Sequence, residues 1–392
     1  MSFDAVVVGA GPAGLMAARK IAEKGFSVLV CERGRDLGQK ACAEGIPDFG
    51  FKIAEIPVSK SLISNSIDGV QFFPPDERKA LEIKGFYKGY ILNKQFFLYA
   101  LADKAVEAGA ELRMQSNVSG IKTYNGQAKK VRYECAGELH EVECKVLVGA
   151  DGVGSIVSKS CGFYRTGYEV ASCLQCLMVN CNINDTNIIR IYLGNEVAPF
   201  GYAWIFPKNE FMANVGVGVR SKSADQYLKK FISNHSQFFG KASIIKMVGG
   251  LVPVGGQLKE IVRNNTVLCG DAAGQVLPAI SGGIWTGMIA GKGVGAAVSE
   301  ALEAHDLSLL NGYPKKFGKY WGKCIDRSLA VLKIIQKLHD DDFNKLATII
   351  NGQDILNLAN GTNTNAVVWK LIMHPIFTMK LAYRLLRRSN VK

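Results

Sequence analysis

The sequence feature that most constrains the fold is a glycine-rich turn, Gly9-Ala10-Gly11-Pro12-Ala13-Gly14, close to the N-terminus. An apolar stretch over residues 3–8 precedes this turn, and a helical pattern over residues 12–24 follows it. A strand, a Gly-x-Gly-x-x-Gly turn and a helix in this order predict the start of a βαβ unit that binds the pyrophosphate of a dinucleotide.

Each glycine of the turn is expected to have a separate task. Gly9 permits the tight turn, Gly11 lets the backbone approach the phosphates, and Gly14 lets the helix pack closely on the strand. Glu32 follows the next predicted strand, residues 27–31, where its carboxylate can accept both hydroxyl protons of a ribose. Free N–H groups at the start of the first helix would then attract the phosphates.

Two later segments favour FAD over NAD as the dinucleotide. Residues 148–155 read Val-Gly-Ala-Asp-Gly-Val-Gly-Ser and contain Asp151, and residues 268–274 read Leu-Cys-Gly-Asp-Ala-Ala-Gly. Asp271 follows a predicted strand and is placed to bind the ribityl chain that only a flavin has, with an ordinary helix N-cap as the alternative. A helix starting near Gly282 would point its positive end at the flavin ring and stabilise the negative charge of reduction.

The order of the predicted elements indicates a mixed α/β (α+β) protein with interleaved domains. A Rossmann-like FAD-binding domain is predicted from three separate segments, residues 1–50, 91–164 and 256–300. A β-sheet substrate domain is predicted from residues 51–90 and 165–255, followed by a helical C-terminal region over residues 301–392. A chain of 392 residues is too long for one compact core, which agrees with two or three lobes.

Local patterns predict further elements. Residues 93–109 form an amphipathic helical pattern, residues 129–148 read as a hairpin, and residues 266–269 read as a strand. The stretch from residue 34 to residue 50 is too irregular to predict a helix or a strand.

Charge and cysteine content limit the partners and the location. The formal net charge of +13 predicts an anionic partner, which can be nucleic acid, anionic lipid or an acidic redox protein. No nucleic-acid-binding motif is present, so nucleic acid is the first of these three partners to be excluded. Ten scattered cysteines and a strand that begins almost at Met1 favour a cytoplasmic protein with free thiols. Cys173 and Cys176 lack a second close pair, so no metal site is predicted.

Three aromatic residues alternate in the segment over residues 199–208. Alternation places Tyr202, Trp204 and Phe206 on one side of a predicted strand. Such a face either lines a long apolar slot or belongs to the core of a sheet, and the residues alone favour the sheet core.

Longer motifs resemble known families. The three nucleotide motifs resemble the flavoprotein group that includes para-hydroxybenzoate hydroxylase. Within that fold, the chain resembles the geranylgeranyl reductase family in four places, which follow in the family's order. These are the Tyr-x-Trp-x-Phe-Pro-Lys stretch at residues 202–208, Gly-Gly-Leu-Val-Pro at residues 249–253, residues 336–342, and Cys42-Ala43-Glu44-Gly45.

The resemblance implies an FAD-dependent reductase. The expected reaction saturates isolated C=C bonds of geranylgeranyl chains in isoprenoid (archaeal ether) membrane lipids, by hydride transfer from reduced flavin and protonation. The alternatives within the fold are a flavin-dependent monooxygenase or halogenase and an electron-transfer flavoprotein. Expected partners are an isoprenoid lipid substrate and a reduced electron donor, which can be ferredoxin, a deazaflavin or NAD(P)H.

The motifs and the resemblance together imply the site residues. Predicted cofactor contacts are Gly9, Gly11, Ala13, Gly14, Glu32, Arg33, Cys42, Ala43, Gly45, Asn93, Val118, Asp151, Gly270, Asp271, Gly282, Gly283 and Ile284. Predicted substrate contacts are Tyr202, Trp204 and Phe206. Asn93 stands where the family has an arginine, and Lys94 supplies a positive charge one position along.

Cys42 is the predicted catalytic residue. An isolated alkene has no carbonyl to polarise it, so hydride addition needs a proton donor in a dry pocket. Cys42 either donates that proton or shapes the flavin face, and an inert buried thiol is the alternative.

The basic amphipathic tail from Val367 to Arg388 suits a helix on an anionic membrane, with a helix docked on the protein as the alternative. A tail helix bound to the membrane would place the protein on the inner face of the cell membrane.

Overall fold

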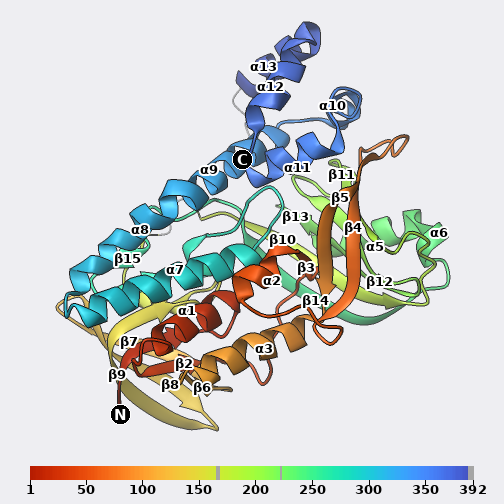
Figure 1. Cartoon of the computed structure of the whole chain (residues 1–392). Helices are drawn as coiled ribbons and strands as arrows, with labels where there is room; N and C mark the ends of the chain where they lie inside the picture. Colours follow the sequence, from red (N-terminus) through yellow and green to blue (C-terminus); the bar gives the residue numbers. More distant parts are fainter. Residues whose placement is uncertain (165–167, 221–222, 387–392) are drawn as a thin grey trace.

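The computed structural model describes residues 1–164, 168–220 and 223–386, and it contains two eight-stranded sheets (Figure 1). Strands of the two sheets alternate along the chain, so neither sheet is built from one continuous segment. This arrangement confirms the predicted mixed α/β fold, in which a nucleotide domain is interleaved with a second sheet.

The first sheet has a parallel centre in the order β16-β9-β1-β2-β6. Its strands are β1 (Ser2–Val8), β2 (Val28–Cys31), β6 (Glu111–Arg113), β7 (Asn117–Tyr124), β8 (Gln127–Cys135), β9 (Glu138–Gly149), β15 (Val262–Arg263) and β16 (Thr266–Leu268). Strand β2 is fully buried, as expected for a parallel strand covered on both faces. The predicted strand, hairpin and strand at residues 27–31, 129–148 and 266–269 are therefore confirmed to within two residues at each end.

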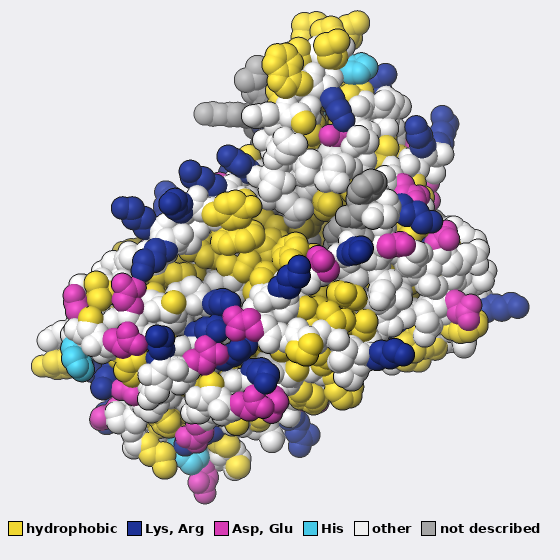
Figure 2. All heavy atoms as spheres, in the orientation of Figure 1, with side chains coloured by type: hydrophobic (Ala, Val, Ile, Leu, Met, Phe, Trp, Pro, Cys, Tyr) yellow, Lys and Arg dark blue, Asp and Glu magenta, His cyan; other side chains and the backbone are white. Residues whose placement is uncertain are grey.

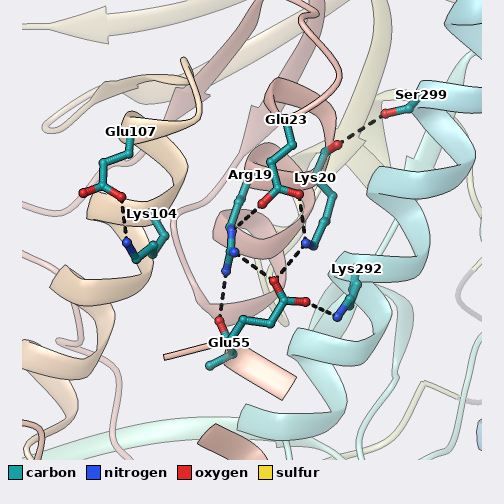
Figure 3. Close-up of polar contacts among 9 residues, drawn as sticks. Arg19, Lys20, Glu23, Glu55, Lys104, Glu107, Lys292 and Ser299 are labelled. Carbon is teal, nitrogen blue, oxygen red and sulfur yellow. Dashed lines mark hydrogen bonds and ion pairs between the residues drawn. The ribbon is translucent and has the colours of Figure 1, made fainter. Parts of the chain in front are cut away.

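Three helices pack on the first sheet: α1 (Pro12–Ala22), α3 (Lys94–Glu107) and α7 (Ile284–Glu303). Helices α1 and α7 cross closely, because a methyl group at Gly291 would lie 2.1 Å from the carbonyl oxygen of Ala13. Glu55 accepts hydrogen bonds from Arg19, Lys20 and Lys292 and so ties α1 to α7 (Figure 3). The nucleotide turn is thus held between two helices that approach each other at glycine.

The second sheet has the order β14-β10-β13-β12-β11-β4-β5-β3 and is antiparallel except where β11 pairs with β4. Its strands are β3 (Gly45–Pro47), β4 (Ile63–Phe73), β5 (Leu81–Leu92), β10 (Val170–Val179), β11 (Ile188–Leu193), β12 (Tyr202–Asn209), β13 (Met212–Val219) and β14 (Ser243–Pro253). Helices α5 (Ala224–Asn234) and α6 (Ser236–Phe239) interrupt the β-rich segment.

The prediction of an irregular stretch over residues 34–50 is wrong at its end. Residues 45–47 form β3, which pairs with β5, and α2 (Phe49–Ala54) follows directly. The chain therefore enters the second sheet at Gly45. A three-residue edge strand is too short to show a period of two, so no sequence pattern revealed it.

The C-terminal region is helical, as predicted, and two of its helices project from one end of the molecule (Figure 1). Its elements are α8 (Gly312–Phe317), η3 (Gly318–Gly322), α9 (Lys323–Ile335), α10 (Asp340–Leu346), α11 (Gly352–Asn360), α12 (Thr364–Ile372) and α13 (Pro375–Leu386).

The tail that the sequence presented as one helix is two helices. The chain breaks before Pro375, which lacks an N–H donor and starts α13. Arg387 and Arg388 of the predicted tail lie outside the described residues. Within the described ranges, no helix combines the length and the apolar character that crossing a bilayer requires.

Candidate active site

A single cavity of about 1820 Å³ is lined by both sheets and by the C-terminal helices. Typical small-molecule sites occupy roughly 300–1,000 Å³, so this cavity has room for a dinucleotide and for a second ligand. All of the predicted site residues except Gly14 and Asn93 line it. One cavity therefore brings together predicted site residues that are up to about 275 positions apart in sequence.

The glycine turn closes one end of the cavity. Gly9 has φ +100°, and a methyl group there would lie 2.5 Å from the carbonyl oxygen of Ala150. A methyl group at Gly14 would lie 1.9 Å from the carbonyl oxygen of Gly9, so Gly14 serves helix packing instead of lining the cavity. At Gly11 a methyl group would meet no described atom within 4 Å. Gly11 thus leaves the space through which a pyrophosphate would reach the backbone.

Glu32 fixes the turn from the neighbouring strand. Its carboxylate accepts hydrogen bonds from the backbone N–H groups of Ala10 at 2.8 Å and of Gly34 at 2.7 Å. Arg33 and Val118 line the cavity beside it. The carboxylate is therefore oriented before any ligand binds, and its remaining lone pairs are available to ribose hydroxyl groups.

Asp151 has a structural task that the sequence did not show. One carboxylate oxygen accepts hydrogen bonds from the N–H groups of Ile156 at 2.6 Å and Val157 at 3.1 Å, at the start of α4 (Ile156–Ser160). The other oxygen is buried and has no hydrogen-bond partner among the described residues. Burial raises the pKa of Asp151. The same residue therefore caps a helix and lines the cavity.

Asp271 forms an ion pair with Lys40, a partner that no sequence pattern indicated. Burial alone would lower the pKa of Lys40, but Asp271 outweighs this effect and raises it. The Tyr168 hydroxyl donates to the backbone carbonyl of Asp271 at 2.5 Å. Asp271 is thus fixed where the second nucleotide segment meets the loop that carries Cys42.

The structure separates Asn93 from Lys94. The Asn93 amide accepts from the Ser64 hydroxyl at 2.6 Å and donates to the Ser61 carbonyl at 3.0 Å, outside the cavity lining. Lys94 is buried, lines the cavity and donates to the Lys40 carbonyl. The positive charge at this position therefore comes from Lys94.

The loop with Cys42 is held against the second sheet by side chains of β10, β12 and β13. Gln175 donates to the Cys42 carbonyl at 2.9 Å, and Asn214 donates to the Ala43 carbonyl at 3.2 Å. Lys208 donates to the Glu44 carboxylate at 2.5 Å. These bonds span more than 130 positions of sequence, so the sheet fixes the backbone of the loop that carries the thiol.

The three aromatic residues of β12 line the cavity, so they form part of the apolar slot and not of a closed sheet core. The Tyr202 hydroxyl donates to the Ile280 carbonyl at 2.7 Å, and burial raises its pKa. Trp204 lies over Gly216, where a methyl group would come within 2.3 Å of the indole. Its indole N–H is buried without a partner in the described part of the chain.

The far end of the cavity is apolar and was missed by sequence reasoning. Side chains from β4, β11 and the helices α9 to α13 line it, among them Val70, Ile189, Leu332, Ile335, Leu346, Ile350, Leu371 and Leu381. The amphipathic pattern of the tail was visible in the sequence. The cavity beneath it was not, because the pattern does not show what a helix packs against.

A Rossmann-like nucleotide turn that opens on a large cavity lined by the second sheet defines the chain as a dinucleotide-binding protein with room for a further ligand. The model of the geranylgeranyl reductase catalytic domain matches residues 169–252, and that of an NAD(P)-binding Rossmann-like domain matches residues 7–54. A digeranylgeranylglycerophospholipid reductase of Methanosarcina acetivorans is 37% identical over 358 residues, which cover 88% of each chain. The chain belongs to the geranylgeranyl reductase family.

Other comparisons extend over the whole length. A digeranylgeranylglycerophospholipid reductase of Methanopyrus kandleri is 32% identical and covers 99% of this chain and 100% of its own. A geranylgeranyl bacteriochlorophyll reductase-like protein of Thermoplasma acidophilum has 29% identity and a TM-score of 0.85, covering 91% of this chain and 95% of its own.

A flavin-dependent brominase has 17% identity and a TM-score of 0.73, covering 92% of this chain and 94% of its own. This similarity shows a shared fold only. The Rossmann-like match indicates a dinucleotide site in the first 54 residues.

Proposed function

We propose that the protein is an FAD-dependent reductase that saturates isolated C=C bonds of geranylgeranyl chains in archaeal ether lipids. The single observation that carries this proposal is the continuous cavity, polar at the glycine turn and apolar beneath the C-terminal helices. A long isoprenoid chain needs an extended apolar slot that adjoins the reactive end of the cofactor. The names and archaeal sources of the relatives support the same substrate.

The residues present fit FAD. Gly11 leaves room for the pyrophosphate, and Glu32 and Asp271 both line the cavity, where each is held by its own partners for the ribose and the ribityl chain. Gly283 precedes α7, whose N-terminal N–H groups would stabilise negative charge on the ring. We assign the remaining predicted cofactor residues that line the cavity to the same ligand. Asn93 is left out, because its amide is bonded elsewhere.

FAD, once bound and reduced, would supply the hydride for one alkene carbon. This chain supplies the dry surroundings and the geometry: Tyr202, Trp204 and Phe206 line one wall, and the Cys42 loop lines another. The Cys42 sulfur accepts a hydrogen bond from the Glu44 N–H at 3.3 Å, which leaves the thiol proton free to be donated. We assign Cys42 to protonation of the second alkene carbon.

The decisive experiment supplies dithionite as reductant and a digeranylgeranylglyceryl phospholipid as substrate, and follows the mass of the lipid. A gain of two hydrogen atoms per reduced bond supports the reductase. Peroxide or hydroxylated product in the presence of oxygen and NADPH, with no saturated lipid, would support a monooxygenase instead.

We also propose peripheral contact with an anionic membrane through α12 and α13. The inner faces of both helices line the cavity, whereas their outer faces are exposed and apolar. The residues concerned are Trp369, Ile372, Met373, Ile376, Met379 and Tyr383, which are 50–81% exposed. Exposed Lys380 adds a positive charge. An apolar surface continuous with a lipid cavity suits the entry of a substrate from a bilayer.

Flotation with anionic vesicles tests this contact. The double variant Trp369→Glu/Ile376→Glu is expected to lose flotation, and the control Leu139→Glu, at an exposed apolar residue of β9, is expected to float like the parent. Equal flotation of all three proteins would show that these helices do not bind the membrane.

A further inference from the structure

An aromatic chain leads from the protein surface to the cavity. The ring centroids of Tyr320 and Trp321 are 4.7 Å apart, and those of Trp321 and Trp285 are 5.3 Å apart. Tyr320 is 58% exposed, whereas Trp285 is 8% exposed and lines the cavity in the first turn of α7. Edge-to-face rings at these distances are in van der Waals contact. The three rings therefore form one packed path from solvent to the place proposed for the flavin ring.

The outer part of this path lies on an unusual backbone segment. Tyr320 and Trp321 belong to η3, a π-helical turn of five residues inserted between α8 and α9. π-Helical turns inside longer helices are rare, because they disrupt the regular hydrogen bonding of the helix. Those that do occur are often found at functional sites. The rare turn and the surface end of the aromatic chain coincide.

The surface around η3 is basic. Residues 312–335 include six Lys or Arg residues and one Asp. Lys315, Lys319 and Lys323 are exposed and have no carboxylate partner within the described ranges. Figure 2 shows hydrophobic side chains gathered beside the long diagonal helix of α8, η3 and α9, with Lys and Arg along its outer edge. An apolar centre with a charged rim is the usual composition of a protein interface.

We propose that this surface, defined by Lys315, Lys319, Tyr320 and Lys323 and named here the donor face, binds an acidic one-electron carrier protein. Electrons pass from the carrier to the flavin along Tyr320, Trp321 and Trp285. The proposal rests on the proposed function, because it needs a flavin at the inner end of the path. Positive charge around the contact steers an acidic partner toward it.

The electron count closes with such a carrier. Each encounter oxidises the carrier by one electron, and two encounters supply the two electrons that saturate one C=C bond. The two protons come from solvent through the protein. The three rings are neither oxidised nor reduced, since they act only as a closely packed medium through which an electron tunnels. A nicotinamide would instead have to touch the flavin to pass a hydride, and the sequence holds one glycine-rich dinucleotide turn.

Binding is measured first, on the cofactor-free chain, by calorimetry with an oxidised, strongly acidic ferredoxin as the probe. The variant Lys319→Glu/Lys323→Glu is compared with Lys241→Glu/Lys246→Glu, which changes the net charge equally at exposed lysines near β14. We expect the first variant to weaken binding by about tenfold or more at low salt, and the difference to fade at high salt. Equal weakening by both variants would overturn the donor face.

Electron transfer is measured next, on the flavin-loaded protein, by stopped-flow absorbance with the reduced ferredoxin. Trp321→Leu is expected to slow flavin reduction by ferredoxin while binding is unchanged, and Trp321→Phe is expected to restore much of the rate. An unchanged rate for Trp321→Leu would overturn the path. Vesicle binding that depends on Lys319 and Lys323, together with ferredoxin binding that does not, would assign the surface to a membrane.

Reduction of the geranylgeranyl lipid with dithionite separates the two proposals. Dithionite needs no docking surface, so a failure with the parent protein would refute the proposed function alone. Normal turnover of Lys319→Glu/Lys323→Glu with dithionite, combined with slow turnover with ferredoxin, would support both proposals.

Discussion

Replacing Lys208 by Met tests whether the second sheet positions the Cys42 loop. Lys208 donates to the Glu44 carboxylate at 2.5 Å and to the Ser64 hydroxyl at 3.1 Å, and its side chain is 12% exposed. Removing one partner of a buried ion pair costs about 3–5 kcal/mol, whereas an exposed pair contributes about 0.2–1 kcal/mol. Glu44 is 20% exposed and keeps its bond from Asn214, so we expect a loss of about 2 kcal/mol.

This loss can be read by calorimetry. An unfolding entropy of roughly 2.1 cal/mol/K per residue gives about 0.8 kcal/mol/K for the whole chain. A loss of about 2 kcal/mol then lowers Tm by about 2–3 °C. The control Lys241→Met, at an exposed lysine, should change the stability by less than about 0.5 kcal/mol.

A double-mutant cycle decides whether the pair itself carries the effect. Lys208→Met and Glu44→Gln in one chain should cost less than the sum of the single changes, by about 1–2 kcal/mol. The rate at which a thiol reagent modifies Cys42 should rise in Lys208→Met, because the loop is held less firmly. Additive costs together with unchanged Cys42 reactivity would refute the reasoning.

Three further predictions concern the site and the helix contacts. Cys42→Ala should retain flavin binding but lose lipid reduction by about 10²-fold or more, measured as saturated lipid per minute, and an unchanged rate would remove Cys42 from protonation. Gly45→Ala should destabilise the protein by about 1–3 kcal/mol in chemical denaturation, because a methyl group there would lie 2.6 Å from the Phe206 ring. The ion pairs of Glu55, of which the pair with Lys292 has the largest effect, lower the pKa of Glu55 from 4.5 to about 2. The contribution of Glu55 to stability is therefore complete above pH 4.5 and is lost as the pH falls toward 2. Glu55→Gln should therefore weaken the acid dependence of Tm in that range, and an unchanged acid dependence would contradict this.

Local patterns in the sequence predicted the elements that follow local rules. The turn at Gly9 and Gly14 was predictable because a tight turn and a close helix contact each exclude a side chain. The alternation of Tyr202, Trp204 and Phe206 predicted a shared face, and the structure puts that face in the cavity.

Contacts between the two sheets could not be predicted. Gln175 and Cys42 are 133 positions apart, and Lys40 and Asp271 are 231 apart, so no local period relates them. Asn93 and Lys94 show how a one-residue offset matters, since consecutive residues of a helix point about 100° apart. Asn93 precedes α3 and Lys94 begins it, so only the lysine reaches the cavity.

The alternation of strands between the two sheets also sets an order for assembly during synthesis. Strand β1 pairs with β9, which ends at Gly149, and β9 pairs with β16, which ends at Leu268. Non-local pairs of this kind form only after the later strand has left the ribosome. The nucleotide site therefore stays incomplete until about three-quarters of the chain has been made. Binding of the cofactor therefore cannot stabilise the early strands until then.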